Sequence, residues 1–145
     1  YNFKTLNATD FPNNFELIHA LSAAVIYDWR TFKLALGGKW HSGKPITNPL
    51  SNVLNTTNPA QPKIDYDLPN DTYLPEYFQL NFSASKDWKL NQKMILQTSL
   101  SVLNVLNNQN IIHRYYRINA SQNGIEKINT YSLQRTPNLN IKLSF

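Results

Sequence analysis

The sequence predicts an all-β fold of antiparallel strands, and three observations lead to that prediction. Apolar and polar residues alternate with a period of two along several segments, as they do in a strand whose two faces meet different surroundings. Clusters of turn residues separate these segments. No apolar run approaches the roughly 20 residues that a membrane-spanning helix needs. Alternation of this kind suits a soluble sandwich or barrel as well as a barrel that crosses a membrane.

The first predicted hairpin joins a strand over residues 15–29 to a strand over residues 31–42, through a tight turn at 27–30. One face of this hairpin is apolar, and the opposite face is mixed or polar. The apolar residues are Phe15, Leu17, Leu21, Ala23, Val25, Tyr27 and Trp29, then Phe32, Leu34, Leu36, Gly38 and Trp40. Residues 43–74 have no periodicity and are rich in Pro, Asn, Asp and Thr, which predicts a long unstructured connection.

A second hairpin follows, with one strand over residues 75–88, a short turn at 89–92 and another strand from about residue 93. The alternation stops at the Asn-rich segment 104–110 and resumes over residues 111–118. We interpret residues 93–118 as one long strand with a bulge, and a separate hairpin is the alternative.

A Gly-containing loop over residues 120–126 leads into the final predicted strand, which covers residues 130–145 in a single register. Its last nine residues alternate strictly and end on Phe145 with the apolar register intact. Because most chain ends are poorly ordered unless something holds them, this pattern favours a closing strand that pairs with a neighbour.

The predicted connections are alternately short and long, so one end of the sheet carries only tight turns. Aromatic residues concentrate near the strand ends, as in the two aromatic girdles of a membrane barrel. These aromatic residues are Tyr27, Trp29, Trp40, Tyr77, Phe78, Trp88, Tyr115, Tyr116 and Phe145. Both features favour a transmembrane β-barrel segment over a soluble antiparallel fold.

Composition argues against several other classes of function. The chain has 145 residues, a formal net charge of +5 and no cysteine. Because Lys and Arg are scattered rather than clustered, we expect no nucleic-acid partner. The three histidines lie on different predicted strands, and the acidic residues near Asp65 and Asp67 lack the spacing of a calcium loop. We therefore expect no metal site, no cofactor and no catalytic residue, and hence no enzyme.

Three segments also resemble a known family. Leu74-Pro-Glu-Tyr-Phe-Gln-Leu-Asn-Phe-Ser-Ala-Ser85 resembles a strand of TonB-dependent outer-membrane receptors of the Bacteroidetes type. Ser99-Leu-Ser-Val-Leu-Asn-Val-Leu-Asn-Asn-Gln-Asn110 is similar to their next-to-last strand. Tyr131-Ser-Leu-Gln-Arg-Thr-Pro-Asn-Leu-Asn-Ile-Lys-Leu-Ser-Phe145 is similar to their closing strand. The three occur in the same order as in that family.

The resemblance implies that residues 1–145 form the last five or so strands of a 22-stranded barrel in a bacterial outer membrane. The plug domain and the segment that contacts TonB would lie outside this chain. The implied function is energised import of a scarce nutrient without covalent chemistry. Its implied partners are outer-membrane lipid, the rest of the barrel and the plug, the TonB complex, and in some receptors a surface lipoprotein. The alternatives are a soluble β-barrel or sandwich that binds a ligand, and a structural outer-membrane barrel.

A barrel of this kind divides the strand residues into two candidate sets. Facing the lumen we expect Lys33, Lys39, His41, Gln79, Asn81, Gln97, Ser99, Asn138, Asn140 and Lys142. Facing lipid, in the closing strand, we expect Leu139, Ile141, Leu143 and Phe145. Substrate selection is expected in the long loops, where side chains can vary without disturbing the wall of the barrel.

Overall fold

The structure is a computed structural model that describes residues 2–4, 10–121 and 123–145. Every regular element in these ranges is a β-strand, and all strand pairs are antiparallel, which confirms the predicted all-β class. The described residues contain no helix of the length and apolarity that would let it cross a membrane. The chain divides into two compact units, which are treated separately below.

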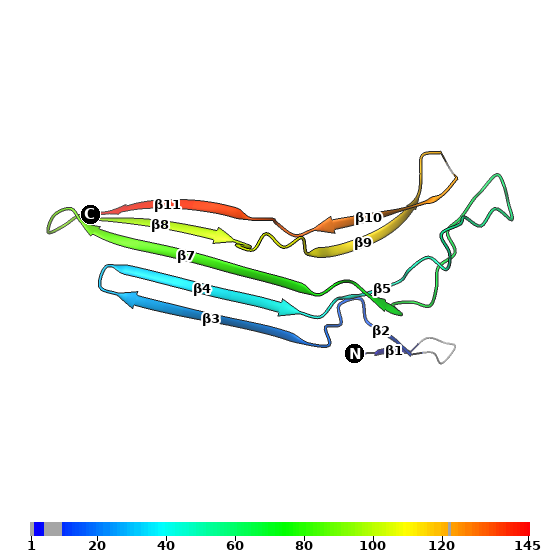
Figure 1. Ribbon diagram of the computed structural model, residues 1–145, viewed down its shortest axis with the longest axis horizontal. Helices are drawn as coiled ribbons and strands as arrows, with labels where there is room; N and C mark the ends of the chain where they lie inside the picture. Colours follow the sequence, from blue (N-terminus) through cyan, green and yellow to red (C-terminus); the bar gives the residue numbers. More distant parts are fainter. Residues whose placement is uncertain (1, 5–9, 122) are drawn as a thin grey trace. The chain divides into compact units, whose positions relative to one another are not determined.

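The sheet unit contains residues 20–41, 77–109 and 132–145. Its five strands are β3 (Ala20–Trp29), β4 (Phe32–His41), β7 (Tyr77–Lys89), β8 (Ile95–Leu103) and β11 (Thr136–Ser144). They form one sheet in the order β11-β8-β7-β4-β3, so each strand lies beside the strands that precede and follow it in this unit (Figure 1). The alternating segments of the sequence thus become a continuous meander.

Two tight turns connect strands at one end of this sheet. Arg30 and Thr31 join β3 to β4, and Arg30 adopts a left-handed conformation with a φ of 57°. Residues 90–94 join β7 to β8, where the amides of Leu90 and Asn91 donate to the carbonyl oxygen of Met94. The connections at the opposite end, over residues 42–76 and 104–135, are long. The predicted asymmetry between the two ends of the sheet is confirmed.

The loop unit contains residues 1–19, 42–76 and 110–131. It holds three short sheets with two strands each. Their strands are β1 (Asn2–Lys4) with β2 (Asp10–Pro12), β5 (Pro45–Ile46) with β6 (Thr72–Tyr73), and β9 (Ile111–Ile118) with β10 (Ile125–Tyr131). The buried nonpolar residues of the described chain are Leu54 and Leu74, with Gly43 and Pro45, and all four belong to this unit.

The prediction of an unstructured connection over residues 43–74 is wrong. The two arms of this segment pair antiparallel at β5 and β6, and again at Pro49 with Tyr66 and at Asn55 with Lys63. Asn70 ties the base of the segment to the N-terminal part of the unit, since its Nδ2 donates to the carbonyl oxygen of Pro12 at 2.8 Å. The contacts that order the segment are therefore non-local, and they leave no period in the sequence.

Three predicted strands also differ from those observed. The first begins at Ala20 rather than at residue 15. Residues 93–118 form β8 and β9 in separate units, so the bulged long strand is wrong and its alternative, a separate hairpin, is confirmed. Likewise residues 130–145 are divided between β10 and β11, with a break at 132–135.

Candidate functional site

The register of the five-stranded sheet separates its side chains into two faces. Residues paired across neighbouring strands project to the same side, so the pairings extend each face over all five strands. We call one side the apolar face. It comprises Leu21, Ala23, Val25, Tyr27, Trp29, Phe32, Leu34, Leu36, Gly38, Trp40, Phe78, Leu80, Phe82, Ala84, Lys86, Trp88, Leu96, Thr98, Leu100, Val102, Pro137, Leu139, Ile141 and Leu143.

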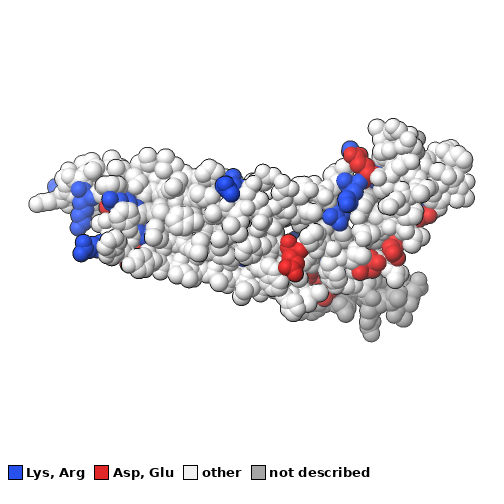
Figure 2. All heavy atoms as spheres, viewed as in Figure 1, with Lys and Arg blue, Asp and Glu red and all other residues white. Residues whose placement is uncertain are grey.

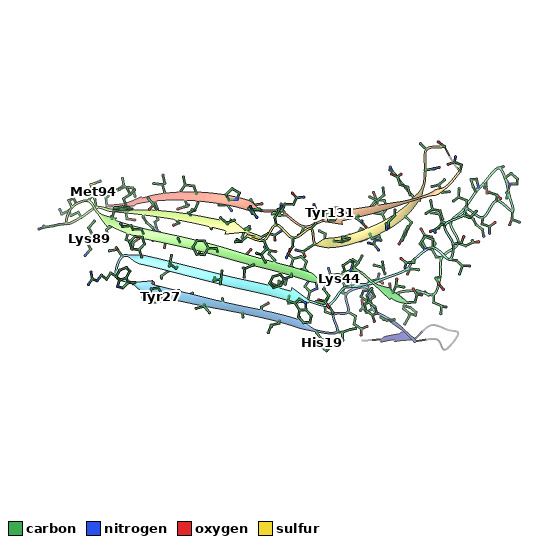
Figure 3. The ribbon with its side chains drawn as sticks, in the orientation of Figure 1. His19, Tyr27, Lys44, Lys89, Met94 and Tyr131 are labelled. Atoms are coloured by element: carbon green, nitrogen blue, oxygen red, sulfur yellow. The ribbon has the colours of Figure 1, made fainter. Side chains whose placement is uncertain are left out.

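The apolar face is widely exposed in the described chain. Val25 is 70% exposed, Leu139 72% and Ile141 65%. A soluble protein seldom exposes a contiguous apolar patch larger than a few hundred Å². The five strands form one sheet, whose side chains are drawn in Figure 3. A surface of this kind needs an apolar surrounding or another protein surface against it.

All ten lumen candidates lie on the opposite side, which we call the polar face. The pairings place Lys33, Ser99 and Asn140 in one cross-strand row, and Gln97 and Lys142 in the next. Lys39 pairs with Gln79, and His41 lies two residues further along β4. Asn81 pairs with Gly37, and Asn138 pairs with Ser101. Leu139, Ile141 and Leu143 lie on the apolar face, while Phe145 follows the last strand residue and is 95% exposed.

Four of the ten candidates gather around Tyr77, near the end of the sheet with long connections. The imidazole of His41 stacks on the Tyr77 ring at 4.7 Å between centroids, and Lys39 Nζ lies 5.9 Å from that centroid. The Tyr77 hydroxyl donates to Gln79 Oε1, and Gln79 Nε2 donates to Asn81 Oδ1 at 2.8 Å. This chain of hydrogen bonds continues to the backbone amide of Asn104. The sequence indicates Tyr77 only as an aromatic residue near a strand end, and the pairing with His41 places it at the centre of this cluster.

Charged residues gather at the end of the sheet that carries the tight turns (Figure 2). On the polar face, Lys33 forms an ion pair with Asp28 at 3.5 Å, and Asp87 accepts a hydrogen bond from Gln97. Arg30, Lys89 and Lys93 lie in or next to the two turns. The two acidic residues here thus have partners on the polar face, and the turns carry cations.

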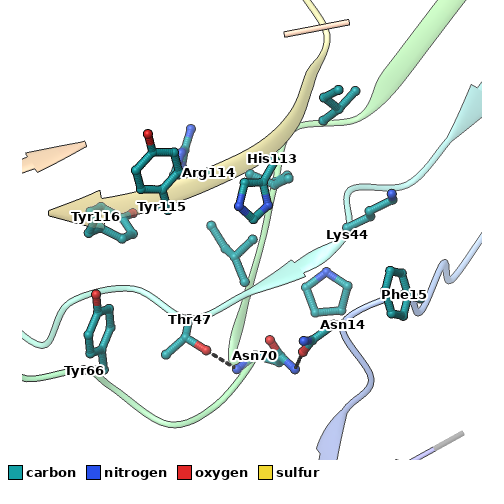
Figure 4. A pocket seen from close by; sticks show the side chains of 14 residues that line it. Asn14, Phe15, Lys44, Thr47, Tyr66, Asn70, His113, Arg114, Tyr115 and Tyr116 are labelled. Carbon is teal, nitrogen blue, oxygen red and sulfur yellow. Dashed lines mark hydrogen bonds between the residues drawn. The ribbon is translucent and has the colours of Figure 1, made fainter. Parts of the chain in front are cut away.

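The loop unit contains a separate candidate site, a concave pocket of about 410 Å³ (Figure 4). β9 contributes His113, Arg114, Tyr115 and Tyr116 to one side of it. The other residues that line it are Asn14, Phe15, Lys44, Pro45, Ile46, Thr47, Tyr66, Asn70, Leu74 and Ile112. Lys44 and Arg114 are cationic, and the lining contains no carboxylate. Such a pocket suits a ligand with an anionic group and a flat apolar part.

Hydrogen bonds hold the walls of this pocket in place. The Tyr116 hydroxyl donates to Asn48 Oδ1 at 2.6 Å, which connects β9 to the 42–76 segment. Asn70 has a φ of 58°. Its backbone N–H donates to Thr47 Oγ1, and its side-chain Nδ2 donates to Asn14 Oδ1. Arg114 Nε donates to Asn129 Oδ1 on β10 at 2.7 Å. The sequence predicts ligand selection in the long loops. Of the residues in these hydrogen bonds it singles out only Tyr116, as an aromatic residue near a strand end.

Asp65 and Asp67 of the loop unit have local partners. Asp65 accepts a hydrogen bond from Asn55 and forms an ion pair with Lys63, and Asp67 accepts from the amide of Leu68. Groups of three or more His, Cys, Asp or Glu that could hold a metal ion do not occur in the described part of the chain. A hydrogen bond to Glu126 raises the pKa of Arg117, so this exposed guanidinium stays protonated.

No known protein family, curated protein or solved structure matches this chain.

Proposed function

We propose that the chain is the C-terminal barrel portion of a TonB-dependent receptor that imports a scarce nutrient across the bacterial outer membrane. The observation that carries this proposal is the exposed apolar face, which extends over five strands while every lumen candidate lies on the opposite side. Lipid would cover the apolar face, and the polar face would meet a wet interior and the plug. Together with about 17 further strands, the sheet would close into a 22-stranded barrel.

The height of the apolar face agrees with this proposal. On β7 the face extends from Phe78 to Trp88, about 34 Å of extended chain. A strand tilt of ~40° reduces this length to about 26 Å along the membrane normal, close to the ~25 Å apolar band of outer-membrane barrels. Trp88 at one end and Phe78 and Trp40 at the other correspond to aromatic girdles.

The connections also support a defined orientation. Outer-membrane barrels have short turns on the periplasmic side and long loops on the outer side. The turns at 30–31 and 90–94 would therefore face the periplasm, and the connections over 42–76 and 104–135 would face outward. The pocket of the loop unit would then be available to an external ligand.

The membrane part of the proposal is tested by two adjacent substitutions on β11. Ile141→Lys places a charge against lipid, which costs about 2–4 kcal/mol near mid-membrane. Asn140→Lys places the same charge in a wet interior and should be tolerated. The measurement is the fraction of protein in isolated outer membranes that shows heat-modifiable gel migration. Equal tolerance of both variants would contradict the assignment and favour a soluble β module.

The transport part needs a separate experiment. A strain that lacks the protein is grown with iron chelates, vitamins, peptides or glycans as the single limiting nutrient. The proposal predicts a growth defect on at least one of them, and the same defect in a strain that lacks TonB. A barrel that passes the membrane test but gives no TonB-dependent defect on any nutrient would instead have a structural role.

A further inference from the structure

Lys86 is the one charged residue on the apolar face of the five-stranded sheet. It pairs with Phe32 on β4 and with Thr98 on β8, and Thr98 is the one hydroxyl-bearing aliphatic residue on that face. A charge at a lipid-facing position is costly, so a cation here requires a specific partner. The adjacent Asp87 cannot serve, because it lies on the polar face and accepts a hydrogen bond from Gln97.

Two aromatic rings hold the Lys86 ammonium group. Its Nζ lies 3.7 Å from the centroid of the Trp88 ring and 4.5 Å from that of Phe32. The Trp88 ring is itself fixed, since its Nε1 donates to Thr98 Oγ1 at 3.1 Å. Lys86 forms none of the ion pairs found among the described residues. The rings stabilise the cation but leave its charge unneutralised.

A shallow groove of about 390 Å³ runs from this ammonium group across the apolar face. Ala84, Leu100 and Leu139 line the groove beside Lys86, and the pairings place these three residues in one cross-strand row. The groove therefore combines a cationic end with an apolar trough. A lipid has the matching chemistry, with a headgroup at one end and an acyl chain at the other.

We propose that this groove binds an anionic phospholipid, with the phosphate on Lys86 Nζ and an acyl chain over Ala84, Leu100 and Leu139. This inference rests on the proposed membrane location. Charge decides the lipid class. A choline headgroup would need the open faces of the aromatic rings, and Lys86 already occupies those of Phe32 and Trp88. The cation of the adjacent β3–β4 turn, Arg30, adds further attraction for a negative headgroup.

The position of Lys86 along β7 fits headgroup contact. It lies two residues inward from Trp88, a distance of about 7 Å along an extended strand. The long apolar stem of lysine can cover such a distance and place its ammonium group at the interface. The same stem covers apolar surface that would otherwise meet the hydrocarbon.

The test measures quenching of Trp88 fluorescence by brominated lipids, because Trp88 touches Lys86. Trp29 and Trp40, which also lie on the apolar face, are replaced by Phe in all variants. The protein is reconstituted in phosphatidylcholine vesicles that contain a small, equal fraction of dibrominated phosphatidylglycerol or dibrominated phosphatidylcholine. The proposal predicts that phosphatidylglycerol associates about fivefold more strongly, as expected for one cationic side chain near an anionic headgroup. Lys86→Gln should remove this preference, and Lys86→Arg should keep it. Lys89→Gln is the control, with the same change of charge three residues away on the polar face.

The outcomes distinguish a specific phospholipid site from general charge attraction and from failure of the membrane location. Equal association of both lipids with the unmodified protein would overturn the phospholipid site. Loss of preference in Lys89→Gln as well as in Lys86→Gln would also overturn it, since the effect would then come from general charge. Absence of quenching by either lipid would instead contradict the membrane location itself. Heat-modifiable migration of Lys86→Gln establishes that the variant is folded.

Discussion

Asn104 shows how a single side chain can organise a break between strands. It is fully buried and has a φ of 52°, a conformation that Asn tolerates better than most residues. Its Nδ2 donates to the carbonyl oxygens of Asn108 and Leu133, and its Oδ1 accepts from the amide of Asn108. The largest fully buried side chain of the described residues is thus polar, and it secures the end of β8 to the start of β11.

Asn104→Ala should lower the free energy of unfolding by about 3 kcal/mol, because it leaves buried groups unpaired and strains the backbone. Asn104→Gly removes the same hydrogen bonds without the backbone strain, so its loss should be smaller. Urea unfolding in detergent measures both variants. A loss below 1 kcal/mol in Asn104→Ala would mean that these hydrogen bonds do not hold the segment.

Gly43 illustrates a close approach of two backbones. A Cβ at this position would lie 1.6 Å from the carbonyl oxygen of Leu74, at the base of the 42–76 segment. Gly43→Ala should therefore separate the two arms of the segment and cost at least 1–3 kcal/mol. Gly124→Ala is the matched control, since its added Cβ meets only the Asn119 side chain at 3.4 Å. Limited proteolysis of residues 44–73 reports the difference, and equal resistance of both variants would contradict the prediction.

At the scale of the element, a hydrogen bond from Tyr116 to Asn48 helps to attach the β9–β10 hairpin to the 42–76 segment. Tyr116→Phe removes the hydrogen bond to Asn48 and should weaken this attachment by about 1 kcal/mol. Tyr115→Phe changes the exposed neighbouring ring and serves as the control. Amide exchange of residues 46–50 should become faster in Tyr116→Phe alone. Unchanged exchange would show that other contacts attach the hairpin.

The strands of the sheet were predictable because their information is local. A period of two defines the two faces of each strand, and the observed pairings keep Leu139, Ile141 and Leu143 on the side opposite to Asn138, Asn140 and Lys142. The breaks were not predictable in the same way. Asn104 and Asn107 both adopt left-handed conformations. Their side chains form hydrogen bonds with the backbone of Leu133 and Arg135, which lie far along the sequence.

The pocket of the loop unit escaped prediction for a related reason. Its lining combines residues from three stretches of sequence, represented by Asn14, Thr47 and Tyr116. None of these stretches contains a motif with its own chemistry. Lys86 lies in a series of apolar residues that is otherwise regular, so its charge is easily missed. A charged residue whose neighbours two positions away on both sides are apolar is the signal that could have found it.

At the scale of the whole molecule, the free edges of the two outer strands show where the five-stranded sheet could continue into further strands. β3 and β11 each have a paired edge and an edge that no described strand pairs with. In a closed barrel every backbone group finds a partner, so both edges would be covered. The proposed barrel therefore predicts that residues 20–29 and 136–144 are protected from hydrogen exchange in membranes as strongly as the central β7. Fast exchange of alternate amides in β3 or β11 would show that the sheet ends at that strand.

The connectivity of the sheet has a consequence for the order of folding. β3 pairs with β4, and β7 with β8, through a tight turn. β7 reaches β4 only across residues 42–76, and β11 reaches β8 only across residues 104–135. Early formation of the β9–β10 hairpin would shorten the flexible part of that loop and lower its closure entropy. The hairpin would then act as a kinetic aid to the pairing of β11 with β8.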